Sequence, residues 1–211
     1  MKTTVQKRDD QGLRFFGQVI ASVTHDIKNS LATINENAGL LTDHAAMAAR
    51  GRPLDPEKVN VLAMRIMDQV KRADGLLKNM NRFAHSVDDS LKKVDLNEIL
   101  QLLAALSVRF AAMSGANLDV QPSPKPVVIE TSPFGLLNTL FLCLEVAMTA
   151  AGQGGSIGLR PEKTDNGACV HFGPLPDAAM SNQDHCLSAF IDARLVKNSA
   201  TGTLTLIIHD R

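Results

Sequence analysis

A hydrophobic stripe over residues 11–49 constrains the fold most strongly. Its steps of 4, 3, 4, 4, 3, 4 and 3 residues lie close to the coiled-coil period, so they predict one long helix that buries a face against other helices. We expect the helix to end near Arg50 and Gly51, and Pro53 supports this end. The apolar positions are Phe16, Ile20, Val23, Ile27, Leu31 (or Ser30), Ile34, Ala38 and Leu41.

A second helix is predicted directly after this one. Asp55 suits the N-cap, Pro56 the first helical position and Glu57 the first turn. Two long helices joined by a short loop form an antiparallel hairpin, which alone has too little core to be stable. We therefore expect two copies to pair into a four-helix bundle, a homodimer. The alternative is that the hairpin packs only against the rest of the chain. The apolar positions of this second stripe are Val59, Leu62/Ala63, Ile66, Val70, Ala73, Leu77, Met80 and Ala84.

The pattern of the second half differs from that of the hairpin. Residues 88–94 are interpreted as a linker between a domain at 1–87 and a domain at 95–211. Asp95 and Glu98 resemble a capping box that opens a helix ending before Gly115. Strands and helices then alternate, which indicates a two-layer α/β sandwich and an α+β fold overall. The predicted strands are 117–121, 127–130, 156–160, 168–172 and 203–209, and the predicted helices are 134–151 and 187–198.

The composition narrows the classes of function. The chain has 211 residues, with 22 basic and 22 acidic side chains, so charge gives no case for nucleic acid or an anionic membrane. There is no Trp or Tyr, which disfavours base-stacking surfaces. The N-terminal residues lack the apolar run of a signal peptide, and Asn138 and Glu145 interrupt the most apolar segment. We therefore expect a cytoplasmic protein that does not enter a membrane.

The three cysteines, Cys143, Cys169 and Cys186, are widely spaced and form no CxxC pair. Their surroundings are apolar, so we expect reduced core thiols. No metal site is predicted from them.

The candidate reactive group is His25, in the string from Ser22 to Leu31. It lies between two stripe positions and should therefore point away from the bundle. Asp26 can reach the imidazole and set its tautomer, Lys28 can offset phosphate charge, and Asn29 can hold a phosphate oxygen or orient water. The remaining histidines are expected to be ordinary solvent-exposed residues: His44, His85, His171, His185 and His209.

The segment from His25 to Leu31 resembles the H-box of sensor histidine kinases, commonly H-[DE]-x-[KR]-[NT]-P-L, with Ser30 in place of the proline. The resemblance implies that His25 is phosphorylated on a dimeric hairpin and exchanges the phosphoryl group with a response-regulator aspartate. It implies general acid/base catalysis by Asp26 and a phosphatase role for Asn29. The segments 94–100 and 115–120 are similar to the opening of the family's ATP-binding domain, so the resemblance spans the chain.

The nucleotide-binding motifs of that family are not retained. In the alignment, Leu142 and Val146 stand where the N-box has asparagines, and His171 or Phe172 stands where the adenine-binding aspartate belongs. The phosphate-approaching glycines fall on Cys186 and Ser188, whose side chains would obstruct phosphate. No Asp/Asn constellation is left for Mg²⁺. We therefore expect that this chain binds neither ATP nor a metal ion. The Mg²⁺ needed for phosphoryl transfer is expected in the receiver domain of the partner.

The leading interpretation is a histidine phosphotransferase of a two-component phosphorelay. The chain then resembles pseudo-kinase phosphotransferases of the ChpT type, which pass phosphoryl groups between a histidine and response-regulator aspartates without ATP. The expected partners are receiver domains, with an upstream hybrid histidine kinase as a further candidate. Three alternatives stay open: a response-regulator phosphatase, a non-catalytic pseudo-kinase adaptor, and a histidine kinase with unorthodox ATP contacts. Whether the chain is an enzyme is therefore undecided from sequence.

Overall fold

A computed structural model describes residues 4–176, 191–198 and 200–209, with side chains described from residue 10 onward. Its helices are α1 (Thr4–Ala49), α2 (Pro56–Ala84), the 3₁₀ turn η1 (His85–Val87), α3 (Leu96–Ser114) and α4 (Pro133–Ala151). Its strands are β1 (Lys92–Asp95), β2 (Asn117–Val120), β3 (Val128–Thr131), β4 (Ser156–Thr164), β5 (Gly167–Gly173), β6 (Ala193–Asn198) and β7 (Thr203–His209).

The contacts divide the chain into two compact units. Residues 20–81 form the hairpin unit, and residues 1–19 with 82–211 form the α/β unit. The first turns of α1 thus belong to the α/β unit, where Phe15 lies with its ring centroid 5.3 Å from that of Phe83 and 5.0 Å from that of Phe141. The domain boundary predicted at residues 88–94 separates segments that are expected to fold independently. The division by contacts does not test independent folding, so this boundary stays a prediction.

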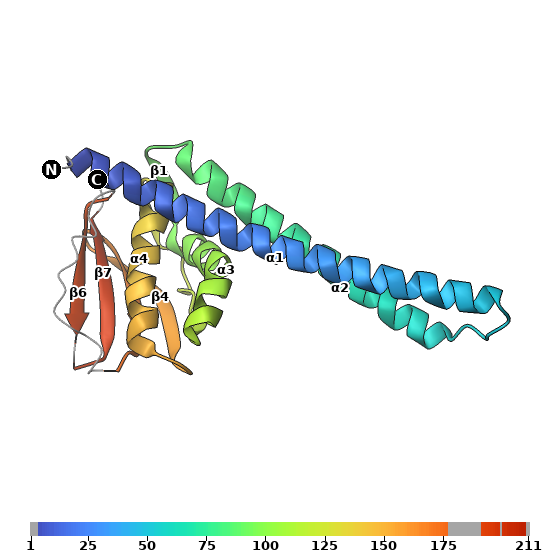
Figure 1. Cartoon of the computed structure of the whole chain (residues 1–211). Coiled ribbons are helices and arrows are strands. Elements are labelled where there is room, and N and C mark those ends of the chain that lie inside the picture. The colour runs from blue at the N-terminus through green and yellow to red at the C-terminus, as the bar shows by residue number, and fades with distance from the viewer. Residues whose placement is uncertain (1–3, 177–190, 199, 210–211) are drawn as a thin grey trace. The chain divides into compact units, whose positions relative to one another are not determined.

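In the hairpin unit, α1 and α2 lie side by side (Figure 1) and together line shallow grooves. The predicted cap is confirmed, since the Asp55 Oδ1 accepts hydrogen bonds from the backbone N–H of Glu57 at 3.1 Å and of Lys58 at 3.3 Å. Gly51 follows the end of α1 with a φ of 86°, a conformation that favours glycine.

The buried face of the α1 part of this unit follows the predicted stripe through Val23 and through Ser30, the alternative to Leu31 at that step. Val23 and Ser30 are buried, whereas Leu31 is 55% exposed, and near the end of the stripe Asn37 is buried in place of the exposed Ala38. On α2 the stripe residues Val70 and Leu77 are likewise about half exposed. The reason is geometric: both stripes are wide, and within a single chain each helix covers only one flank of the other's stripe.

The α/β unit contains a five-stranded sheet in the order β2-β4-β5-β7-β6, and a separate antiparallel pair of β1 and β3. Only the β2–β4 pair in the larger sheet is parallel. Helix α4 packs against β4, β5 and β7, and α3 against β2 and β4 (Figure 1). The inward residues Leu159, Val170 and Leu206 are fully buried. A helical hairpin followed by a two-layer α/β sandwich is therefore confirmed; the pairing of two hairpins is not tested.

The helices of the α/β unit begin and end where the sequence predicts. The Asp95 carboxylate accepts a hydrogen bond from the Asn97 N–H, and Gly115 ends α3 with a φ of 68°. Both α3 and α4 are long and apolar enough, by length and composition alone, to cross a membrane. Helix α4 serves here as the core helix, with Leu140 and Leu144 fully buried, as the sequence predicted.

Two secondary-structure predictions differ from the structure. The helix predicted over 187–198 is wrong for residues 193–198, which form strand β6 and pair antiparallel with β7 from Ala193↔Ile208 to Asn198↔Thr203; residues 187–190 lie outside the described range. The tight turn at Gly202, whose φ is 58°, returns the chain alongside β6, and this pairing outweighs local helix propensity. Residues 92–94, predicted as linker, begin strand β1, which pairs with β3.

Candidate functional site

The candidate site is an exposed turn of α1 within the hairpin unit. The His25 side chain is 47% exposed and that of Asp26 is 16% exposed, whereas Val23 is buried. At about 100° per residue, His25 lies about 160° around the helix from both Val23 and Ile27. The histidine therefore projects from the side of α1 opposite the predicted apolar stripe.

Two side chains converge on one ring nitrogen of His25. The Asn29 Nδ2 lies 3.1 Å from the His25 Nδ1, and the Asp26 Oδ1 lies 3.4 Å from the same atom. Asn29 is one turn further along the helix, so its amide lies beside the ring. The structure thus brings together three of the four residues that the sequence proposed for this site.

These two hydrogen bonds select different forms of the neutral imidazole. A proton on Nδ1 is donated to the Asp26 carboxylate and leaves a lone pair on Nε2, the nitrogen farther from the backbone. With the proton on Nε2 instead, Nδ1 accepts from the Asn29 amide. Nε2 is therefore nucleophilic when Nδ1 donates to Asp26, and it is a hydrogen-bond donor when Nδ1 accepts from Asn29.

Lys28 is exposed on the same turn and makes no ion pair within the part of the chain that the structure describes. Its ammonium is thus placed near His25 by sequence neighbourhood alone. The Asn29 backbone carbonyl accepts a hydrogen bond from the Thr33 Oγ1 at 3.1 Å. The described contacts of the turn involve His25, Asp26 and Asn29, and the exposed Lys28 ammonium can act as a countercharge for an incoming anion.

Of the positions aligned with nucleotide motifs, those that the structure describes lie on two different elements. Leu142 and Val146 are half-buried, one turn apart on α4. Burial raises the pKa of the neighbouring Glu145 carboxyl above its usual value. His171 lies on β5 between the inward-facing Val170 and Phe172, so its side chain is on the face away from α4. Cys186 and Ser188 lie outside the described residues.

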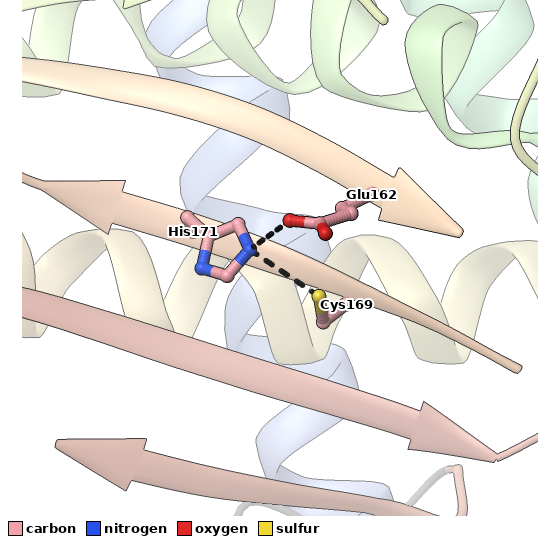
Figure 2. A group of neighbouring side chains, drawn as sticks. All are labelled: Glu162, Cys169 and His171. Atoms are coloured by element: carbon pink, nitrogen blue, oxygen red, sulfur yellow. Dashed lines mark hydrogen bonds and ion pairs between the residues drawn. The ribbon is translucent and has the colours of Figure 1, made fainter. Parts of the chain in front are cut away.

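His171 is not the ordinary solvent-exposed histidine that the sequence predicts. It is half-buried, and its ring contacts Glu162, Cys169 and Thr205 on three neighbouring strands. Figure 2 shows Glu162 and Cys169 turned toward the same ring nitrogen. The Cys169–His171 spacing of two residues was a signal in the sequence, because alternate residues of a strand share a face. The contribution of Glu162 required the register of β4 against β5.

No protein-family model matches the chain, and no curated protein matches it. Among solved structures it is similar to the Acinetobacter baumannii histidine kinase AdeS, with 10% identity, a TM-score of 0.45, and coverage of 88% of this chain and 97% of that one. It is also similar to a bacterial phosphotransferase, with 14% identity, a TM-score of 0.48, and coverage of 92% and 95%. A third similar structure is histidine kinase ThkA in complex with response regulator protein TrrA, with 16% identity, a TM-score of 0.47, and coverage of 98% and 65%.

Proposed function

We propose that the chain is a histidine phosphotransferase of a two-component phosphorelay, with His25 as the phosphoryl carrier. One observation carries the proposal: a half-exposed imidazole whose Nδ1 lies 3.4 Å from the Asp26 carboxylate, on a helix side away from the apolar stripe. A carboxylate that accepts the Nδ1 proton orients the ring and raises the electron density on Nε2. The H-box resemblance of this same string supports the assignment.

The proposed step moves one phosphoryl group between two side chains. The Nε2 lone pair of His25 attacks the phosphorus of an aspartyl phosphate on a receiver domain, so an N–P bond forms and the acyl P–O bond breaks. The aspartate leaves as a carboxylate, and the positive charge that develops on the ring is stabilised through Nδ1–H by Asp26. Lys28 adds a cation near the transferred oxygens. The reverse reaction delivers the group to a second receiver.

The phosphoryl donor in this proposal is another protein, not ATP. The apolar side chains Leu142 and Val146 stand on α4 at positions where the resemblance would require asparagines for Mg²⁺. Receiver domains, which carry the aspartate and its Mg²⁺, are the proposed partners, and an upstream hybrid histidine kinase is a candidate donor. The α/β unit then serves as a docking surface, and the chain works in the cytoplasm.

We further propose that two copies pair through their hairpins. Within the hairpin unit, Ser30 and Asn37 are buried while Leu31, Leu40 and Val70 are about half exposed, the reverse of what a hairpin stable alone would show. The Ser30 Oγ is buried without a hydrogen-bond partner in the described part of the chain. A second hairpin would cover the exposed stripe residues and leave His25 on the outside.

A response-regulator phosphatase is the second candidate, and one distance favours it. The Asn29 amide lies closer to Nδ1, at 3.1 Å, than the Asp26 oxygen does, at 3.4 Å. When Asn29 donates to Nδ1, Nε2 carries the proton and cannot attack phosphorus. In that form the turn would orient water toward a regulator's aspartyl phosphate without itself becoming phosphorylated.

The test of the leading function uses two purified receiver domains. One is loaded with labelled phosphate, mixed with the chain, and then chased with the second. The proposal requires label to appear on the chain and then on the second receiver, and to disappear from both in His25→Ala. Transfer between the receivers that persists in His25→Ala would end the proposal.

The same experiment separates the two candidates. A phosphatase releases the label as free phosphate, and Asn29→Ala slows that release more than His25→Ala does. A phosphotransferase keeps its transfer in Asn29→Ala, because Nδ1–H can still donate to Asp26. Glu36→Gln, an exposed polar change on the same helix, is the matched control for both assays.

A further inference from the structure

The outer face of the larger sheet carries three metal-binding side chains at one point. In the register of β4 and β5, Glu162 lies directly opposite Cys169, and His171 is the next residue along β5 on the same face. The neighbouring residues Val170 and Phe172 face inward and are fully buried, which fixes Cys169 and His171 outward. Two adjacent strands of a hydrogen-bonded sheet thus hold the three side chains on a rigid base.

The three candidate ligand atoms already converge. The His171 Nε2 lies 3.0 Å from the Glu162 Oε2 and 3.3 Å from the Cys169 Sγ (Figure 2), and all three atoms lie within 4.8 Å of one another. In a tetrahedral Zn²⁺ site the N···O and N···S edges are about 3.4 Å and about 3.5 Å, from bond lengths of 2.0 to 2.3 Å. The two edges at His171 therefore need to lengthen by only a few tenths of an ångström to hold the ion.

A fourth residue orients the histidine for this role. The His171 Nδ1 lies 3.0 Å from the Thr205 Oγ1 on β7, which is paired with His171 across the sheet. When Nδ1–H donates to that hydroxyl, the Nε2 lone pair points at Cys169 and Glu162. Metal-binding histidines usually have their second ring nitrogen held by such a hydrogen bond.

The cluster also brings two acidic groups together, since the Cys169 Sγ and the Glu162 Oε2 both lie beside the His171 Nε2. A thiolate beside a carboxylate is unfavourable unless a cation lies between them. Arg160 offers only a loose contact, with its Nη2 3.9 Å from the Glu162 Oε2.

We propose that Glu162, Cys169 and His171 bind one Zn²⁺ ion. Thiolate, imidazole and carboxylate together are a ligand set that suits Zn²⁺, and three protein ligands leave the fourth position for water or an exogenous ligand. That position faces solvent, because the Glu162 side chain is 57% exposed. The site is independent of the chemistry of His25, being in the other compact unit.

The test is titration of the metal-free full chain with Co²⁺, followed by displacement with Zn²⁺. One Co²⁺ per chain is expected to bind, with the intense visible bands of a tetrahedral site and an ultraviolet band from thiolate-to-cobalt charge transfer. Cys169→Ser removes the charge-transfer band. Thr205→Val, which leaves all three ligands in place, weakens Zn²⁺ binding by about 10- to 100-fold.

Two variants keep the result interpretable. Cys143→Ala removes a buried thiol on α4 and is expected to leave the charge-transfer band unchanged. Glu162→Gln changes an exposed side chain, so it weakens Zn²⁺ binding without unfolding the chain. The proposal is overturned if the wild-type chain gives no charge-transfer band, if the band survives Cys169→Ser, or if Glu162→Gln binds Zn²⁺ as tightly as wild type.

Discussion

The Asp26 Oδ1 lies 3.4 Å from the Nδ1 of His25, its neighbour in sequence, on the exposed side of α1. This pair gives the first prediction. Asp26→Asn replaces the carboxylate with a neutral amide and so removes the negative charge that stabilises the ring as it becomes positive. Phosphoryl transfer from a phospho-receiver therefore slows by about 10²- to 10⁴-fold, the usual contribution of a positioned acid or base. Initial rates of label transfer measure it. A rate within threefold of wild type in Asp26→Asn would show that the carboxylate plays no such part.

Hairpin pairing is predicted to depend on the exposed stripe of α2. Val70 is 52% exposed in the single chain, so burying its exposed half contributes about 0.8–1.5 kcal/mol, half of the value for a whole side chain. A two-fold interface loses that contribution twice, so Val70→Glu raises the dissociation constant by about 10- to 100-fold. Sedimentation equilibrium measures the change, with Asn60→Glu, an exposed polar position of α2, as control. A wild-type chain that stays monomeric at high micromolar concentration would contradict the predicted dimer.

The aromatic cluster of the α/β unit is predicted to be a major source of its stability. Phe83 is fully buried, with its ring centroid 5.3 Å from that of Phe15 and 5.4 Å from that of Phe16. Phe83→Ala should lower the free energy of unfolding by about 3–5 kcal/mol, because it leaves a cavity. Val87→Ala, at an exposed position close by in sequence, should change it by less than about 0.5 kcal/mol. Urea unfolding of both variants measures these changes. An equal loss of unfolding free energy in the two variants would show that the aromatic cluster is not a major source of stability.

Nucleotide binding is predicted to be absent. Leu142 and Val146 provide no oxygen ligand for the Mg²⁺ of Mg–ATP at the aligned positions. Isothermal titration of the chain with ATP and Mg²⁺ should therefore show no saturable heat at millimolar nucleotide. Saturable binding, or label from ATP on His25, would instead support the kinase alternative.

Local signals in the sequence predicted most of the element boundaries. The caps at Asp55 and Asp95 and the glycine at 115 act within one helical turn, so neighbouring residues suffice to locate them. The β6 strand was missed because its formation depends on pairing with β7, and the turn at Gly202 makes that pairing possible. Strand β1 was missed for a similar reason, since β3 lies more than thirty residues further along the chain.

The two candidate sites differ in how far sequence could locate them. The His25 turn is one stretch of a helix, where Asp26 and Asn29 are neighbours by the helical repeat alone. The cluster at His171 draws on three strands, and only the register brings Glu162 opposite Cys169 and Thr205 opposite His171. The sequence alone could place Cys169 and His171 on one face of a strand, but it could not place Glu162 and Thr205 beside them.

The phosphorylation state of His25 is the most direct test of the proposed function. The chain is incubated with a phosphorylated receiver domain, digested without acid treatment, and analysed by mass spectrometry, with NMR to identify the ring nitrogen. One acid-labile phosphoryl group is expected, on Nε2 of His25, and none in His25→Gln. Phosphate on another residue, or loss of receiver phosphate with none on the chain at any time, would contradict it.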